Sequence, residues 1–166
     1  AHQTATIGAN PLIDLNAEAY DEYHEFMSAA EKTYTEMTHK TVALYNIQQK
    51  LKAVLGSKAI DANSPLYVEG MRLLESLKGW DALMAQRLSK AYDDVENYEN
   101  GFTAYYITMI NQADSSIPKI TEGAKAKMTE LNQRWNALHK EAKQLEALIE
   151  QFNRKAFENG LGLLSN

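Results

Sequence analysis

At residues 128–145 the chain reads MTELNQRWNALHKEAKQL, with apolar side chains that recur at alternating spacings of three and four residues. This 3-4 spacing places them in one stripe along an α-helix and is typical of helices that pack nearly parallel in a bundle. The same phase extends through residues 117–157, and Asn159-Gly160 follows it as a helix-ending signal. The stretch therefore predicts one long amphipathic helix over residues 117–157.

Two earlier segments repeat this spacing. Residues 15–55 keep it for five heptads in two rows, which are Tyr23, Ala30, Met37, Leu44 and Leu51, and Met27, Tyr34, Thr41, Gln48 and Leu55. Ser64-Pro65 then marks a second helix start, because a capping hydroxyl precedes a proline at the first helical position. We expect helices over residues 15–55 and 65–113.

Asn100-Gly101 lies inside the second of these segments and would normally break a helix. The heptad phase nevertheless passes through it, from Tyr98 to Phe102. The rows run through Leu74, Asp81, Leu88, Val95, Phe102 and Met109, and through Leu77, Met84, Ala91, Tyr98, Tyr105 and Gln112. We therefore expect one continuous helix over residues 65–113, with Gly101 as a kink or a point of close contact.

Together the three segments predict an all-α fold, an elongated up-down-up three-helix bundle with coiled-coil-like heptad packing. At about 1.5 Å per residue each helix would span roughly 60 to 75 Å, too long to wrap round a compact core. Along the chain we expect a flexible lead-in at residues 1–13, a single bundle at residues 14–158 and a C-terminal tail at residues 159–166.

Composition excludes several classes of protein. A length of 166 residues corresponds to about one domain, and 45% hydrophobic with 23% charged residues is ordinary for a folded chain. The formal net charge of −5 argues against a nucleic-acid partner, because phosphates repel an acidic chain. The chain has no cysteine for a disulfide, a thiolate nucleophile or a zinc site, and no apolar run long enough to predict a transmembrane segment.

Residues 131–138, Leu-Asn-Gln-Arg-Trp-Asn-Ala-Leu, continuing to Ala142 and Leu145, resemble a helix of the spectrin repeat, in which Leu-Asn-x-x-Trp-x-x-Leu is a core pattern. The resemblance covers residues 117–150. It implies a three-helix bundle that serves as a spacer or as a protein-binding platform. The chain departs from the family in its first helix, which has no tryptophan, and at Leu145, where the family has an arginine.

The residue pattern points to no catalytic, cofactor-binding or metal site. No two of the four histidines stand at the His-x-x-x-His spacing that places two ligands on one helical face. Carboxylate pairs such as Asp93-Asp94 lie off the core rows, on faces expected to be wet, and the glycines are scattered singly and form no phosphate loop. We expect a protein that is not an enzyme and has no cofactor.

Tyrosines off the core rows are the candidate partner-binding residues, since tyrosine is favoured in protein interfaces. We expect the bundle to act through protein–protein interaction, as a spacer, adaptor or assembly subunit, with another protein or with itself. Two alternatives stay open: an exported bacterial surface, pilus-associated or secretion-apparatus component, and a helical bundle that binds a small molecule or lipid. The candidate residues are Tyr20, Tyr45, Tyr92 and Tyr106.

The first residues bear on location. A start such as Ala1-His2-Gln3 fits a chain whose signal peptide has been removed, and it fits a trimmed chain equally. From it we expect an extracytoplasmic location, either periplasmic or secreted.

Overall fold

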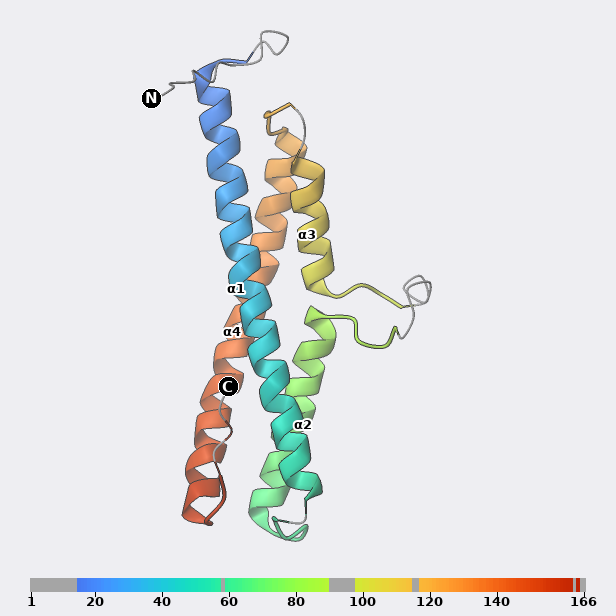
Figure 1. The fold of residues 1–166 in the computed structure, drawn as a ribbon, viewed down its shortest axis with the longest axis vertical. Helices are drawn as coiled ribbons and strands as arrows, with labels where there is room; N and C mark the ends of the chain where they lie inside the picture. Colours follow the sequence, from blue (N-terminus) through green and yellow to red (C-terminus); the bar gives the residue numbers. More distant parts are fainter. Residues whose placement is uncertain (1–14, 58, 90–97, 115–116, 163, 165–166) are drawn as a thin grey trace, which may run out of the picture.

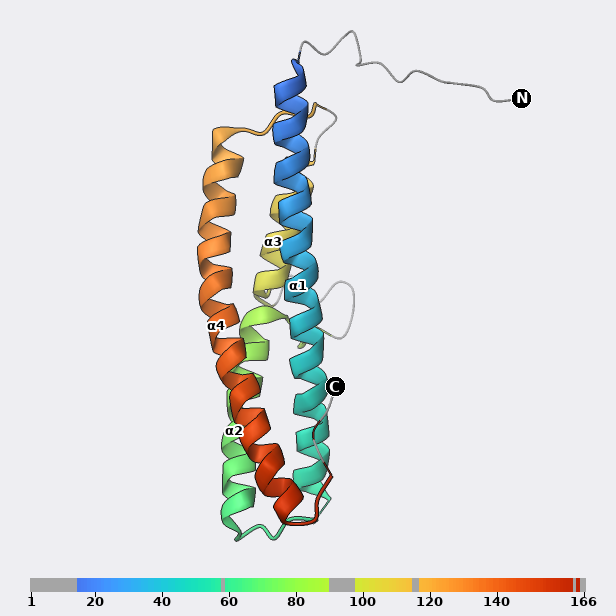
Figure 2. The ribbon, with the colours of Figure 1, turned by 90° about the vertical axis from the view of Figure 1, so that its left-hand side faces the viewer.

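The computed structural model describes residues 15–57, 59–89, 98–114, 117–162 and 164. These residues form four α-helices and no strand, so the prediction of an all-α fold is confirmed. In Figures 1 and 2, α1 and α4 run along the length of the molecule, and α2 and α3 lie end to end beside them. We call this end-to-end pair the α2–α3 column. The helices are α1 (Ala17–Gly56), α2 (Pro65–Met84), α3 (Phe102–Ala113) and α4 (Glu122–Glu158).

The prediction of one continuous helix over residues 65–113 is wrong. Helix α2 ends at Met84, Ala85 has an extended backbone, and the described residues between Ala85 and Gly101 are not helical. Lengths explain the break. An unbroken helix of 49 residues would extend about 73 Å, whereas α1 with 40 residues and α4 with 37 extend about 60 and 55 Å. The surplus turns would have no helix to pack against.

The break also shifts which side chains are buried. Leu88, Tyr98 and Tyr105 stand in the predicted core rows but are 66%, 38% and 50% exposed. Tyr106, predicted off the core rows, is fully buried together with Phe102. Phe102 and Met109 of the first predicted row are buried as expected, whereas the second row is replaced, because α3 is separated from α2 and its own contacts with α1 and α4 set its rotation.

Local capping signals fix where α1, α2 and α4 begin. The side chains of Asn16, Ser64 and Thr121 accept hydrogen bonds from backbone N–H groups three residues ahead, at 3.0, 3.2 and 3.1 Å. The last of these corrects a prediction, because α4 begins at Glu122 and not at residue 117. Ile117, expected in the core stripe, is 52% exposed.

Helix α4 shows the predicted core stripe most completely. From residue 128 onward, each row position of the sequence pattern is buried. Trp135 and Leu138 of the quoted stretch are 3% and 6% exposed, and the indole Nε1 of Trp80 in α2 donates to the Leu138 carbonyl oxygen at 2.9 Å. The buried stripe consists of Met128, Leu131, Trp135, Leu138, Ala142, Leu145, Ile149, Phe152 and Ala156.

After α4 the chain reverses and packs back against the bundle. Gly160 has a φ of +74°, the left-handed conformation that favours glycine, and the N–H of Leu161 donates to the Ala156 carbonyl oxygen at 2.9 Å. The side chain of Asn153 then accepts from the Leu164 N–H at 2.7 Å and donates to the Leu164 carbonyl oxygen at 2.8 Å. The predicted helix end at Asn159-Gly160 is confirmed.

Candidate functional site

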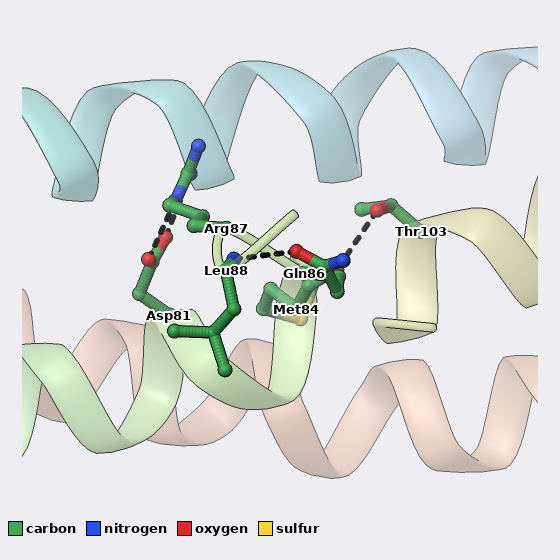
Figure 3. Close-up of polar contacts among 6 residues, drawn as sticks. All are labelled: Asp81, Met84, Gln86, Arg87, Leu88 and Thr103. Carbon is green, nitrogen blue, oxygen red and sulfur yellow. Dashed lines mark hydrogen bonds and ion pairs between the residues drawn. The ribbon is translucent and has the colours of Figure 1, made fainter. Parts of the chain in front are cut away.

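The end of α2 carries a buried ion pair. The Asp81 side chain is 9% exposed, and its two carboxylate oxygens accept hydrogen bonds from Arg87 Nε at 2.6 Å and Arg87 Nη2 at 2.8 Å (Figure 3). A carboxylate this far from water is costly unless it is paired, and the two-bonded guanidinium pair is the strong form of that pairing. The pair therefore ties the first residues after α2 back onto the helix.

Tyr45 of α1 lies under the same guanidinium. The Arg87 Cζ is 3.8 Å from the centre of the Tyr45 ring, within the range of a cation–π interaction. The hydrogen bond to Asp81 raises the pKa of Arg87, burial offsets part of that rise, and the charge of Asp81 adds to it. Arg87 thus joins α1, the end of α2 and the connection that follows α2.

The other end of the break is anchored by backbone contacts. The Thr103 hydroxyl of α3 donates to the Met84 carbonyl oxygen at 2.8 Å (Figure 3), so the start of α3 satisfies an acceptor that the end of α2 leaves open. A Cβ added to Gly101 would lie 2.5 Å from the Met84 carbonyl oxygen and 2.6 Å from the Ala85 backbone. Only glycine fits this close approach, so the predicted role of Gly101 as a point of close contact is confirmed.

The residues that directly follow α2 are also held in place by hydrogen bonds. The side-chain oxygen of Gln86 accepts from the backbone N–H of Leu88 at 2.6 Å and of Ser89 at 3.0 Å. These two bonds and the Asp81–Arg87 pair fix the backbone that presents Leu88. The exposed leucine is therefore held by an ordered turn (Figure 3).

Two clefts flank this break. The α1/α2 cleft has a volume of about 630 Å³, and the α3/α4 cleft has a volume of about 490 Å³. Ala82 and Glu99 line both. The side-chain oxygen of Gln48 is buried beside the α1/α2 cleft without a hydrogen-bond partner in the described part of the chain. Other lining residues are Tyr45, Leu88 and Tyr98 for the α1/α2 cleft, and Leu83, Tyr105 and Arg134 for the α3/α4 cleft.

The four candidate tyrosines do not form one site. Tyr20 is half-buried in the first turns of α1, and Tyr45 is half-buried beneath Arg87 at the α1/α2 cleft. Tyr92 lies outside the described residues. Tyr106 is in the core, where its hydroxyl donates to Asn132 Oδ1 at 2.7 Å, so its prediction as a surface residue is wrong.

The buried position of Tyr106 has an electrostatic consequence. Burial raises the pKa of its phenol, and a hydrogen bond with Thr33 offsets part of that rise. The ring packs against Tyr34 and Phe102, with ring centres 6.4 and 6.1 Å away. Tyr106 thus links α3 to α1 and α4 inside the bundle.

The sequence pattern missed the apolar residues that are exposed at the break. Leu83 lies on the last turn of α2, and Tyr105 lies on the first turn of α3. Leu88 and Tyr98 lie on the connection between the two helices, Leu88 shortly after α2 and Tyr98 shortly before α3. Two signals in the sequence pointed to this region: Asp81 interrupting a core row, and the breaker Asn100-Gly101. Each was outweighed by the continuity of the heptad phase.

The histidines and carboxylates add no metal site in the described residues, where no three such side chains lie close enough to hold an ion. His139 stacks on Trp135 with ring centres 5.0 Å apart, and its Nδ1 is 3.4 Å from Glu36 Oε1. None of the described helices is both long and apolar enough to cross a membrane.

Comparisons with protein-family models, with curated proteins and with solved structures gave no match. The likeness of residues 117–150 to the spectrin repeat therefore rests on the residues of that segment alone.

Proposed function

We propose that this chain acts by binding another protein and not by catalysis. The binding surface in this proposal is the loop-base patch, formed by Leu88 and Tyr98 at the α1/α2 cleft and by Tyr105 at the α3/α4 cleft. In this view the α2–α3 column takes the place of one helix in an up-down-up three-helix bundle with coiled-coil-like packing. The bundle is then a rigid spacer, adaptor or assembly subunit, and the interruption between Met84 and Phe102 presents the patch.

The distribution of exposed apolar side chains is the observation that carries this proposal. In the described part of the chain ten large apolar side chains are exposed. Six of them belong to α2, α3 or the connection between them, and three of these six form the loop-base patch. The longer helices α1 and α4 carry one and two. Exposed apolar residues gathered on one element mark interaction sites more often than scattered ones do.

The base of the patch is ordered before any partner binds. The Asp81–Arg87 pair, the Gln86 turn and the Thr103 contact with Met84 hold the backbone on both sides of the break. A surface held in this way loses little conformational entropy when it binds. Tyrosine and leucine side chains on a fixed backbone are therefore well suited to a protein interface.

The charges of this region support binding over catalysis. A buried carboxylate in a cleft is the usual sign of acid–base chemistry. Asp81 is the buried carboxylate of the described chain, and both of its oxygens are occupied by Arg87. The expectation of an extracytoplasmic location stays a prediction.

Site-specific photo-crosslinking tests the proposal. A benzophenone amino acid is placed at residue 88 or 105, and as a control at Val42, which is 56% exposed on α1. In the cells that make this protein, one polypeptide should cross-link from both patch positions and not from residue 42. The purified polypeptide should then bind the Leu88→Asp variant at least about tenfold more weakly than the wild-type chain.

Two results would contradict the proposal. One is cross-linking that is as strong from residue 42 as from the patch, or absent from both patch positions. The other is a partner whose affinity is unchanged by both Leu88→Asp and Tyr105→Asp, although circular dichroism shows that the variants are folded.

A further inference from the structure

The chain contains two Asn-Gly dipeptides, Asn100-Gly101 before α3 and Asn159-Gly160 after α4. In this dipeptide an asparagine loses its side-chain amide readily, because glycine has no Cβ to keep its backbone nitrogen away from the preceding side chain. The reaction also needs an asparagine side chain and a glycine N–H that are not held by hydrogen bonds. The structure distinguishes the two dipeptides on this point.

Asn159-Gly160 is held at both of the groups that would react. The Asn159 side-chain amide donates to the Lys155 carbonyl oxygen at 2.8 Å, and the Gly160 N–H donates to the Phe157 carbonyl oxygen at 2.9 Å. These bonds belong to the turn that ends α4. Both must break before the Gly160 nitrogen can reach the Asn159 side-chain carbon, so the folded chain protects this dipeptide.

Asn100-Gly101 has neither of these restraints. Asn100 is exposed, and neither its side chain nor the Gly101 N–H makes a hydrogen bond with another described residue. The Gly101 carbonyl oxygen accepts from the Ala104 N–H at 3.0 Å, so the start of α3 is tied to this oxygen and not to the glycine nitrogen. Because Gly101 is buried, the exposed Asn100 side chain is the group that moves when the two meet.

We propose that Asn100 is a site of spontaneous deamidation. The Gly101 nitrogen attacks Cγ of Asn100, and the new N–Cγ bond closes a succinimide ring. The Cγ–Nδ2 bond breaks, and the side-chain NH2 leaves as ammonia with the proton of the Gly101 N–H. Water then opens the ring. Hydrolysis of the N–Cγ bond gives aspartate, and hydrolysis of the bond to the backbone carbonyl carbon gives isoaspartate, in which the chain continues through the side chain.

The two products differ in their effect on the break. Both add a carboxylate to the α3/α4 cleft, which Asn100 lines together with Arg134. Isoaspartate also inserts one more backbone carbon directly before Gly101, whose own backbone packs closely against Met84 and Ala85. Isoaspartate should therefore displace the start of α3, whereas aspartate changes only the charge of the cleft. This modification does not depend on the binding function proposed above.

Peptide mapping by mass spectrometry of the purified full-length chain tests the proposal. The folded chain is incubated for several days in mildly alkaline buffer, because hydroxide removes the proton from the glycine nitrogen, and the change from amide to acid is assigned to single asparagines. Asn100 should deamidate at least about tenfold faster than Asn159, because the turn that ends α4 must open before Asn159 can react. Isoaspartyl methyltransferase should label the peptide that contains residue 100.

Two controls separate the structure from the dipeptide sequence. In concentrated guanidinium chloride the two dipeptides lose their different surroundings, so the rates at Asn159 and Asn100 should agree within about threefold. Asn100→Gln keeps a side-chain amide but would have to close a larger and less favourable ring. The folded variant should therefore show no deamidation at position 100 on the same timescale.

The effect on α3 is measured on the separated products. The isoaspartate form, isolated by ion exchange from the incubated chain, should have a lower Tm than Asn100→Asp, which carries the same charge on an ordinary backbone. Equal melting temperatures would overturn the displacement of α3.

Two results would overturn the deamidation site itself. One is deamidation of the folded chain at Asn159 that is as fast as at Asn100, because the dipeptide sequence alone would then set the rate. The other is a folded chain that stays intact at Asn100 while the unfolded chain deamidates there, because the folded backbone would then keep the two groups apart.

Discussion

The Asp81 carboxylate and the Arg87 guanidinium form a two-bonded ion pair across the end of α2, at 2.6 and 2.8 Å. The carboxylate is 9% exposed and the guanidinium side chain 36% exposed, so the acid belongs to the core and the base to its edge. Asp81 interrupts a row of apolar residues in the sequence. The Asp81 carboxylate can be buried because the chain turns back after α2 and places the Arg87 guanidinium against it.

We predict that Arg87→Ala destabilises the protein by about 2 kcal/mol, because it leaves the Asp81 carboxylate buried without its partner. The value is below that for a fully buried pair because Arg87 is partly exposed and screened. A double-mutant cycle with Asp81→Ala, measured by urea unfolding, should give a coupling free energy of about 1 to 2 kcal/mol. If the losses in free energy of unfolding caused by the two single substitutions simply add in the double variant, the pair does not stabilise the break.

Gly101→Ala should destabilise the protein by about 1 to 3 kcal/mol, because the new methyl group would collide with the backbone of Met84 and Ala85 and not with a movable side chain. Gly79→Ala is the matched control. It adds the same atom to a glycine inside α2 where nothing lies within 4 Å, so it should stabilise the helix by about 0.5 to 1 kcal/mol. Thermal unfolding of both variants measures the contrast, and equal effects would mean that the close approach at Gly101 is absent.

The sequence predicted those parts of the fold that are determined by residues close to one another in the chain. The buried stripe of α4 follows from a period that holds for four heptads, and the end of α4 follows from Asn159-Gly160, because a glycine there allows the left-handed turn. The start of α2 follows from the pairing of a capping serine with Pro65. Each signal lies within a few residues of the structure that it determines.

The break between α2 and α3 could not be predicted in this way. Whether the helix continues beyond Met84 depends on how far α1 and α4 extend beside it, and that is a property of the assembled bundle. The same cause explains the error at Tyr105 and Tyr106, which exchange exposed and buried positions. Phe102 and Met109 stay buried as predicted, so only the second row moves by one residue, from Tyr105 to Tyr106, whose side chains point about 100° apart.

Tyr106→Phe should lower the free energy of unfolding by about 1 kcal/mol at pH 7, because Asn132 loses the hydroxyl that donates to it at 2.7 Å. The difference from wild type should shrink above pH 10. Burial raises the pKa of Tyr106, so the folded state keeps the proton after the unfolded state has lost it. Stability due to this group is therefore complete below about pH 10 and falls as the pH rises through the folded-state pKa.

The control for this pH effect is Tyr105→Phe, a change at the neighbouring half-exposed tyrosine. It should alter the free energy of unfolding by less than about 0.5 kcal/mol at pH 7 and at high pH alike. Urea unfolding at pH 7, 9 and 10.5 gives the free energy of unfolding against pH for the wild type, Tyr106→Phe and Tyr105→Phe. A gap between wild type and Tyr106→Phe that stays constant up to pH 10.5 would contradict the raised pKa.

Asn153→Asp should release the residues that follow α4. The asparagine accepts from the Leu164 N–H at 2.7 Å and donates to the Leu164 carbonyl oxygen at 2.8 Å. Aspartate keeps the acceptor but turns a charged oxygen toward that carbonyl, so we expect a loss of about 1 to 2 kcal/mol. Faster hydrogen exchange at the Leu164 amide would report the release locally. Asn136→Asp, which adds the same charge at an exposed position of α4, should leave that rate unchanged. The prediction would be contradicted if the Leu164 amide exchanged at the same rate in the wild type, Asn153→Asp and Asn136→Asp. Burial of the Leu164 side chain, which is 5% exposed, would then be enough to hold this segment in place.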